Sequence, residues 1–188
     1  MLVAEKKITV HEYLQMEFEG EDAYYELING QVVKKSAPTP LHQEVSILLS
    51  SKMLSHAIQH GLGKVFTAPI DVFLNDYNHF IPDILFIQKD NLKIVDYKEG
   101  ILGVPNLVVE IISRSSILID REDKKRVYES AGVEEYWLVD PNYRSIEVYQ
   151  NRNGRFEVVS FAIEVGKVQS VVLPGFEVDI KELFPVAA

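Results

Sequence analysis

Cysteine is absent from this chain of 188 residues. Its absence excludes disulfide scaffolds, zinc sites built from thiolates and cysteine nucleophiles, so any metal ion would bind to oxygen or imidazole. Long apolar runs are absent too, since none approaches the ~20 residues that a helix needs to cross a bilayer. Residues 1–7 lead into Ile8–Glu12 rather than into the apolar stretch of a signal peptide. We therefore expect a soluble, cytoplasmic protein that does not act at a membrane.

Positive charge is scarce as well. The chain has 19 Lys and Arg residues against 28 Asp and Glu residues, and its formal net charge is -9 at pH 7. Because nucleic-acid affinity comes largely from cationic side chains that displace counterions, this balance opposes a general attraction to polyanions. A nuclease can still concentrate its cations on one face while a carboxylate cluster holds a divalent ion. The net charge therefore counts against nucleic-acid binding without excluding it.

Apolar residues are plentiful. Hydrophobic residues make up 47% of the chain and charged residues 25%, which is the balance of one compact domain with a substantial core. No repeat and no Ser/Gly-rich linker divides the sequence. We expect a single domain over residues 1–188, with its core at about 41–140 and a C-terminal antiparallel β-extension at about 145–188.

The first half of the chain indicates a β-hairpin, a long helix and three strands. Asn29-Gly30 between the runs Tyr24–Ile28 and Gln31–Val33 is a strong hairpin signal. Over Leu41–His60, apolar residues recur at spacings of three and four, which predicts the first long helix. Short runs rich in branched or aromatic side chains predict strands at Val65–Leu74, Ile81–Ile87 and Asn106–Ile112.

The second half indicates a helix followed mainly by strands. The helix is expected over Arg121–Ala131 and ends at Gly132, a residue suited to the left-handed conformation. Strand Glu135–Val139 follows it. Beyond Ser145 the pattern indicates antiparallel strands, with turns at 151–154 and 166 and a short helix near 179–183. Together these elements predict a mixed α/β fold.

Two carboxylates stand in apolar strands. Glu110 shares one strand face with Val108 and Ile112, and Asp83 shares a face with Leu85 in the preceding strand. Burial of an isolated charge is costly, so such a group is normally protonated, paired or bound to a cation.

A lysine shows the opposite anomaly on the next helix. Lys124, Val127, Tyr128 and Ala131 follow one another at helical spacing, which places Lys124 on the stripe that faces the core. Asp120 lies four residues earlier, a suitable spacing for an ion pair with Lys124.

Two acids on neighbouring strands and a lysine from the next helix suit phosphodiester chemistry. Carboxylate oxygens are ligands for a hard cation such as magnesium, which lowers the pKa of a bound water and neutralises charge on a phosphate. In a purely structural interpretation, Asp83 only starts a strand while Glu110 and Lys124 form a buried ion pair. Residue type also favours a core position for Tyr128 and Trp137 over a role in base stacking.

The sequence resembles the Uma2 (DUF820) branch of the PD-(D/E)XK nuclease superfamily, in blocks that span nearly the whole chain. The most specific block is Gly132–Pro141, which reads GVEEYWLVDP. The other matching positions are Tyr25–Gly30, His42, Pro82-Asp83, Val104–Ser113, Asp120, Lys124, Tyr128 and Leu173–Phe176. The resemblance implies a restriction endonuclease-like core, in which helices flank a mixed sheet.

The resemblance also implies roles for individual residues. Asp83 and Glu110 would bind Mg2+ or Mn2+, with the main-chain carbonyl of Ile111 as a further ligand. Glu26 would complete the metal shell or support it from outside. His42 would make a supporting contact, whereas residue type alone favours an exposed histidine at the start of a helix.

One departure from the superfamily's simplest motif concerns the lysine. That motif has a lysine two residues after the second acid, where this chain has Ile112. Proteins similar to Uma2 carry the lysine on the following helix, and Lys124 is the matching position. Lys124 is also the residue that the helical spacing singles out.

The resulting hypothesis is a divalent-metal-dependent endonuclease that acts on DNA. Asp83 and Glu110 would hold the metal, Glu26 would assist, and Lys124 would position or activate the attacking water. A homodimer would suit the cutting of both strands. The alternative is a catalytically silent domain of the same fold that binds nucleic acid or another protein, which the acidic balance and Ile112 favour.

Overall fold

The computed structural model describes residues 6–18, 24–113 and 118–184. The elements in chain order are α1 (Val10–Tyr13), β1 (Tyr25–Ile28), β2 (Gln31–Lys34), α2 (Pro40–His60), β3 (Gly63–Thr67), β4 (Val72–Asn75), β5 (Asn78–Phe80), β6 (Ile84–Gln88), η1 (Lys89–Ile94), β7 (Val95–Asp96), β8 (Gly100–Ile101), β9 (Leu107–Ile111), η2 (Ile119–Lys124), α3 (Lys125–Ala131), β10 (Glu135–Asp140), β11 (Ser145–Arg152), β12 (Arg155–Ile163), β13 (Lys167–Gln169), β14 (Glu177–Asp179) and η3 (Ile180–Glu182).

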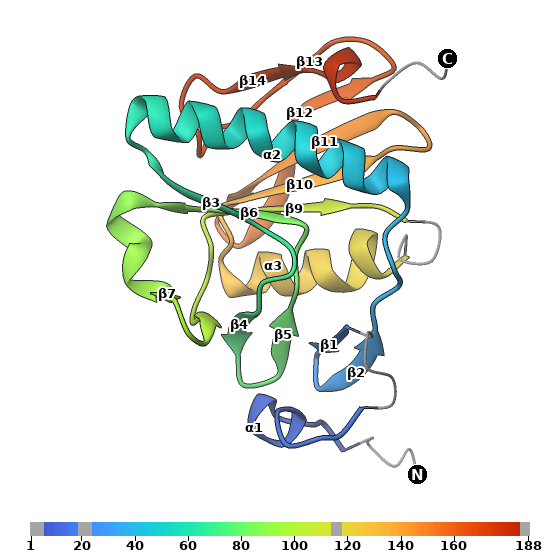
Figure 1. Cartoon of the computed structure of the whole chain (residues 1–188), viewed down its shortest axis with the longest axis vertical. Helices are drawn as coiled ribbons and strands as arrows, with labels where there is room; N and C mark the ends of the chain where they lie inside the picture. The colour runs from blue at the N-terminus through green and yellow to red at the C-terminus, as the bar shows by residue number, and fades with distance from the viewer. Residues whose placement is uncertain (1–5, 19–23, 114–117, 185–188) are drawn as a thin grey trace.

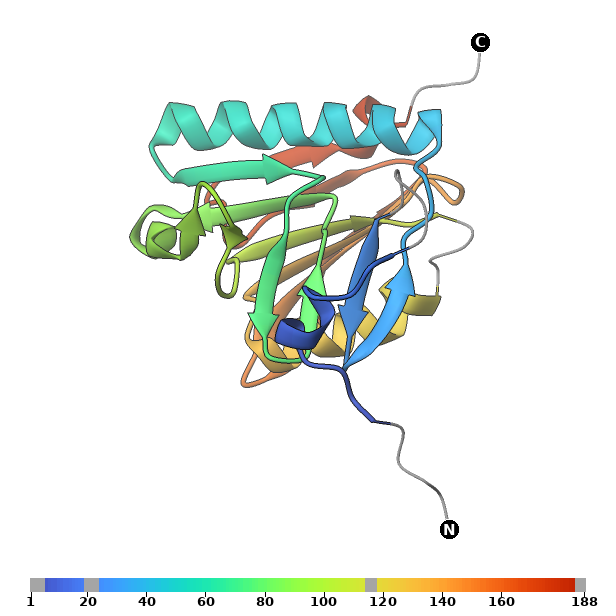
Figure 2. The ribbon, with the colours of Figure 1, turned by 60° about the horizontal axis from the view of Figure 1, so that its bottom comes forward.

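A mixed six-stranded sheet forms the centre of the molecule, in the order β12-β11-β10-β9-β6-β3. Its β9 and β10 run parallel, whereas β6 and β9 run antiparallel. Helix α2 and the hairpin β13–β14 cover one face of this sheet, and α3 covers the other (Figure 1). A second six-stranded sheet has the order β2-β1-β5-β4-β8-β7. Figure 2 shows its hairpin β1–β2 beside β4 and β5, on the side of the molecule away from α2. The chain therefore has the mixed α/β fold that the sequence predicts.

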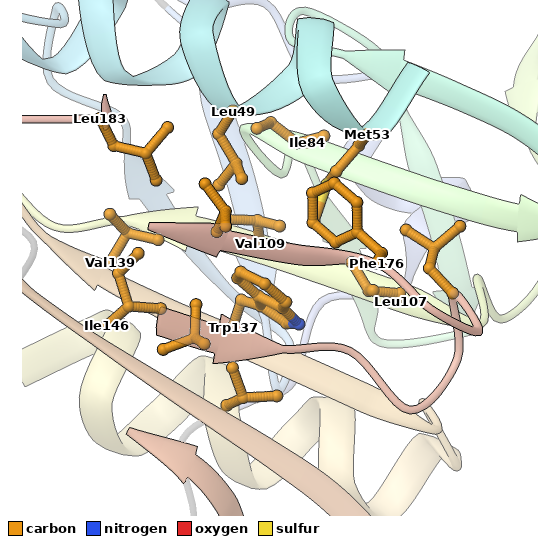
Figure 3. Packing of buried hydrophobic residues seen from close by; sticks show 14 of the residues in the cluster. Leu49, Met53, Ile84, Leu107, Val109, Trp137, Val139, Ile146, Phe176 and Leu183 are labelled. Carbon is orange, nitrogen blue, oxygen red and sulfur yellow. The ribbon is translucent and has the colours of Figure 1, made fainter. Parts of the chain in front are cut away.

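Alternation along the central strands divides the core between two faces. Ile84 and Phe86 of β6 pack with Leu49 and Met53 of α2, together with Trp137 (Figure 3). The intervening residues of β6 pack on the opposite face, with Val127 and Tyr128 of α3 and with the second sheet. A strand covered on both sides has no polar face, which explains why β6 and β9 read as continuous apolar runs.

The hairpin, the long helix and the helix that ends at Gly132 are confirmed. Asn29 and Gly30 have φ values of 52° and 80°, as a tight two-residue hairpin turn requires. Helix α2 begins with Thr39 as its cap, and Gly61 ends it in the left-handed conformation. The second helix begins at Ile119 rather than Arg121, because one π-helical segment (η2) precedes the α-helix α3, and it ends at Gly132 as predicted.

The predicted strand Val65–Leu74 is wrong. The structure has two strands there, β3 and β4, and they belong to different sheets. Pro69 lies between them and has no N–H to donate to a ladder. The predicted strand Ile81–Ile87 similarly starts late, at Ile84 after Pro82, and the short strand β5 that precedes it was not predicted. The chain therefore changes sheets at each of these prolines.

The C-terminal part is antiparallel, as expected. Strands β11 and β12 pair with each other, and β11 also pairs with β10, so all three continue the central sheet. The hairpin β13–β14 and the 3-10 turn η3 follow, close to the predicted short helix. Among the described residues, no helix is both long enough and apolar enough to cross a membrane.

Candidate active site

Four carboxylates and two lysines meet where the hairpin β1–β2, the central strands and the second helix come together. Asp83 precedes β6, Glu110 lies on β9 and Glu26 on β1, whereas Asp120 and Lys124 come from η2. All five side chains are buried, with exposed fractions of 1% to 4%. They line a cavity of about 340 Å³, and the second lysine, Lys35, lines it too. The structure thus brings together the acids and the lysine that the sequence indicates.

Lys124 lies between three carboxylates. Its Nζ is 2.8 Å from Glu26 Oε2, 3.1 Å from Glu110 Oε1 and 3.6 Å from Asp120 Oδ1. The position follows from the sequence, because Tyr128 one turn later faces the core on the same stripe. Burial alone would lower the pKa of Lys124, but the facing carboxylates outweigh it and raise the pKa well above its ordinary value. The structure therefore confirms that the Lys124 side chain faces the core, and its ammonium stays charged.

Glu110 accepts two hydrogen bonds at one oxygen. Tyr128 Oη donates to Glu110 Oε1 over 2.7 Å, and Lys124 Nζ donates to the same oxygen. Burial raises the pKa of Glu110 to about 8, although Lys124 and Lys35 favour the charged form. Tyr128 is a core residue, as predicted, and its hydroxyl also fixes this carboxylate.

Glu26 is anchored to the neighbouring backbone. The amide of Ile81 donates to Glu26 Oε1 over 2.8 Å, and Lys124 Nζ donates to the same oxygen over 2.9 Å. The carboxylate thus ties the N-terminal hairpin to the segment that leads into Asp83. Its place in the cluster agrees with the position that the resemblance implies, whereas its role stays a prediction.

Asp83 is held by three donors. The amide of Ile111 donates to Asp83 Oδ2 over 2.7 Å, His42 Nε2 lies 3.1 Å from the same oxygen, and Lys35 Nζ lies 3.2 Å from Oδ1. Burial alone would raise the pKa of Asp83, but Lys35, His42 and the Ile111 amide together lower it below its ordinary range. Asp83 is therefore an anion with a fixed orientation. The role of the Ile111 carbonyl stays a prediction.

His42 is buried, so the exposed histidine that its residue type favours is wrong. It lies in the first turn of α2, where its amide donates to Thr39 Oγ1, and its ring reaches Asp83. Its exposed fraction is 8%. The His42 side chain points into the site because it lies on the same face of α2 as Val45 and Leu49, which pack against the sheet.

Lys35 is a residue of the site that the sequence analysis missed. Its Nζ donates to the Ile81 carbonyl over 2.5 Å as well as to Asp83. Burial alone would lower the pKa of Lys35, but Asp83 outweighs it and the pKa is raised. A lysine just past a hairpin strand carries no local signal of this role, because its partners are 46 and 48 residues away in the sequence.

The purely structural interpretation accounts for only part of the cluster. Glu110 and Lys124 do form a buried ion pair. However, Glu26 and Asp120 contact the same ammonium, and Asp83 makes a separate pair with Lys35. The pair of Glu110 and Lys124 is therefore one part of a larger charged network beside a cavity.

The cluster offers the kind of donor that a hard divalent cation prefers. Its four carboxyl groups, from Glu26, Asp83, Glu110 and Asp120, outnumber the two lysines that contact them, Lys35 and Lys124. Oxygen donors of this kind suit Mg2+ or Mn2+. Within the described ranges, however, no group of three His, Asp or Glu side chains is placed to hold a metal ion. Lys124 stands between Glu26 and Glu110, and its ammonium bridges these two carboxyl groups.

Comparison with known proteins places the chain in a family. The model of the Uma2 family, described as "Putative restriction endonuclease", matches residues 10–181. An uncharacterized protein of Synechocystis sp. (sll1609) is 27% identical over 158 residues, which cover 82% of this chain and 88% of that protein. A second uncharacterized protein of the same organism (slr1290) is 25% identical over 182 residues, which cover 93% of this chain and 90% of that protein.

A solved structure has the same fold. It is the crystal structure of a "putative nuclease belonging to DUF820" from Anabaena variabilis, with a TM-score of 0.76 and 20% sequence identity. The match covers 94% of this chain and 97% of that chain, which confirms the predicted fold over nearly the whole length. With the family model matched over residues 10–181, this chain belongs to the Uma2 family.

Proposed function

We propose that this protein is a divalent-metal-dependent endonuclease that hydrolyses phosphodiester bonds in DNA. The observation that carries the proposal is the buried cluster of Glu26, Asp83, Glu110, Asp120 and Lys124 in the wall of one cavity. Buried ionisable groups with strongly shifted pKa values are typical of functional sites. Membership of a family whose description is "Putative restriction endonuclease" supports the same function.

Each side chain has a part in the proposed mechanism. Asp83 and Glu110 would hold Mg2+ or Mn2+, with Glu26 and the Ile111 carbonyl assisting. When bound, such an ion lowers the pKa of a water molecule and neutralises charge on the phosphate. Lys124 has three N–H donors on one ammonium. It can therefore orient the attacking water or a phosphate oxygen and stabilise the charge that develops there.

Residues around the acids would keep them in place. Lys35, His42 and the Ile111 amide fix the orientation of Asp83, and Tyr128 fixes Glu110. Loss of a partner that orients a metal ligand typically reduces activity or metal affinity about 10- to 100-fold. His42 is thus a positioning residue in this mechanism.

The test is a cleavage assay on DNA with Mg2+ or Mn2+. The wild-type protein should cut DNA, EDTA should abolish the cutting, and Asp83→Ala should lower the rate at least about 100-fold, as loss of a principal electrostatic group does. Asp90→Ala is a matched control, because Asp90 is an exposed acid outside the cavity. Circular dichroism would check that each variant is folded. Equal cutting by wild type and Asp83→Ala would refute the mechanism.

A catalytically silent domain is the second candidate. Two observations favour it: Lys124 already bridges Glu26 and Glu110, and no three His, Asp or Glu side chains in the described ranges are placed to hold an ion. Titration calorimetry with Mn2+ separates the two candidates. Stoichiometric binding that disappears in Glu110→Gln supports the enzyme, and the absence of binding to wild type supports the silent domain.

A further inference from the structure

The acid cluster lies in the wall of a cavity rather than on an open surface. Glu110 is 1% exposed and Asp83 4% exposed, and both line the cavity of about 340 Å³. This volume is near the lower end of the range for ligand pockets, about 300–1,000 Å³. A phosphate that contacts these acids therefore has to approach them through the cavity. The stacked and paired nucleotides of a double helix cannot enter it without being extruded.

Part of the cavity wall is apolar. The apolar residues of the lining include Val33 of β2, Pro38 before α2, Ile47 of α2, Ala68 and Pro69 after β3, and Ile81 after β5. A nucleobase is flat and apolar on its faces, and such walls can hold it without base-specific hydrogen bonds. A hydrated, fully charged sugar-phosphate backbone would gain little from them.

Few cationic side chains in the cavity lining could contact the phosphates of a duplex. Among the described residues, the lysines that line the cavity are Lys34, Lys35 and Lys124. Lys35 and Lys124 are bound to carboxylates, which leaves Lys34 as the exposed one. Since binding along a duplex depends on many contacts between cations and phosphates, the described lining of the cavity offers few of the contacts that a double helix needs.

Tyr24 provides an aromatic surface next to the acids. Its carbonyl accepts a hydrogen bond from the Lys35 amide over 2.8 Å, so the pairing of the hairpin continues one residue beyond β1. Because alternate residues of a strand share a face, Tyr24 is on the same face as Glu26, and both line the cavity. The adjacent Tyr25 instead stacks on Phe18, with ring centroids 4.4 Å apart. The Tyr24 side chain is 52% exposed, so its ring is accessible to a ligand.

We infer that this cavity admits one unpaired nucleotide of a DNA strand and that Tyr24 stacks against its base. The substrate class is therefore single-stranded DNA, or duplex DNA with an unpaired nucleotide, rather than a perfectly paired duplex. This inference rests on the proposed nuclease function, because only that function makes the ligand a phosphodiester. It adds a binding residue and a substrate preference that the acids alone do not supply.

The test measures binding by fluorescence anisotropy in EDTA, where cutting does not interfere. One labelled DNA sequence is presented as a single strand, as a duplex with one unpaired nucleotide and as a perfect duplex. We expect the first two to bind at least tenfold more tightly than the perfect duplex. Their affinity should also depend weakly on salt, since few phosphates contact lysine. Equal or tighter binding of the perfect duplex would overturn the inference.

Variants of Tyr24 test its role directly. Tyr24→Ala should weaken binding of the single strand about tenfold, as loss of one base-aromatic stack does, whereas Tyr24→Phe should retain it. Tyr143→Ala is the matched control, because Tyr143 is also exposed, at 67%, but lies outside the cavity. Unchanged binding by Tyr24→Ala would overturn the role of the ring.

The outcomes for the inference and for the proposed function can be told apart. A preference for the unpaired nucleotide that depends on Tyr24, without cutting in any divalent cation, supports the binding inference and refutes the nuclease. Cutting of perfect duplex that depends on Asp83 but not on Tyr24 supports the nuclease and refutes the inference.

Discussion

Lys124 and Glu26 are 98 positions apart in the sequence, yet Lys124 Nζ lies 2.8 Å from Glu26 Oε2, and both side chains are buried. The contact joins the N-terminal hairpin to the helix that follows β9. Glu110 and Asp120 contact the same ammonium. One cation that several anions share therefore adds to the strand pairing with β5 that holds the hairpin in place.

Loss of Lys124 should destabilise the protein when divalent cations are absent. Lys124→Met leaves Glu26, Glu110 and Asp120 buried without their ammonium. Removal of one partner of a buried ion pair typically costs about 3–5 kcal/mol of unfolding free energy, which urea denaturation in EDTA would measure. Lys98→Met replaces an exposed lysine and should change the free energy little. A loss below about 1 kcal/mol in Lys124→Met would show that the acids do not need the ammonium.

Divalent cations should stabilise the folded protein, because the carboxyl groups of the cluster outnumber the ammonium groups that contact them. An ion that binds only the native state adds about 2.7 kcal/mol to the unfolding free energy at 100 times its dissociation constant. Thermal denaturation with increasing Mn2+ would measure the effect, with KCl of equal ionic strength as the reference. Glu110→Gln should remove most of it, whereas the exposed Glu157→Gln should retain it. The same Mn2+-dependent stabilisation in the wild type, Glu110→Gln and Glu157→Gln would contradict specific binding at the cluster.

Glu135 should be required for stability although it lies away from the cavity. Its buried carboxylate accepts hydrogen bonds from Trp137 Nε1, Ser170 Oγ and the amides of Val171 and Val172. In Glu135→Gln, an NH2 group faces donors that need an acceptor. Each buried group left unsatisfied costs about 1–3 kcal/mol, so we expect a loss of that size or more in urea denaturation. Glu177→Gln, at an exposed ion pair, should lose less than about 1 kcal/mol.

Local patterns were sufficient to predict the elements on which the site is built. The apolar run of β9 indicated a buried strand and made Glu110 conspicuous, and the helical spacing placed Lys124 toward the core. The resemblance added Glu26, whose own neighbourhood carries no signal. Each of these predictions depends on periodicity or on a motif within a short stretch of chain.

The rest depends on contacts between distant segments. Lys35 and His42 approach Asp83 only because the hairpin and the start of α2 converge there, 48 and 41 residues away along the chain. The break between β3 and β4 was missed because Val65–Leu74 reads as one apolar run, although Pro69 interrupts it. Propensity describes the strands on each side of the proline but not the sheet that each strand joins.

Glu12 should titrate far below its ordinary range. It forms a capping box with Thr9 at the start of α1: the Thr9 amide donates to Glu12 Oε2 over 2.9 Å, and the Glu12 amide donates to Thr9 Oγ1 over 3.2 Å. The Thr9 amide, then Lys6 and the Thr9 hydroxyl, lower the pKa of Glu12 to about 2.

The sign of the pH effect follows from this lowered pKa. A carboxyl group whose pKa falls on folding stabilises the folded state above its unfolded pKa, about 4.3. That contribution is lost as the pH falls from about 4.3 through about 2. NMR titration of the Glu12 side chain should give a midpoint near 2 in the wild type. Thr9→Ala should raise the midpoint only in part, because the backbone amide at position 9, which is the largest cause, is retained. Thr9→Ser, which keeps the hydroxyl, should leave the midpoint low. An ordinary midpoint in the wild type would show that the capping box does not form in solution.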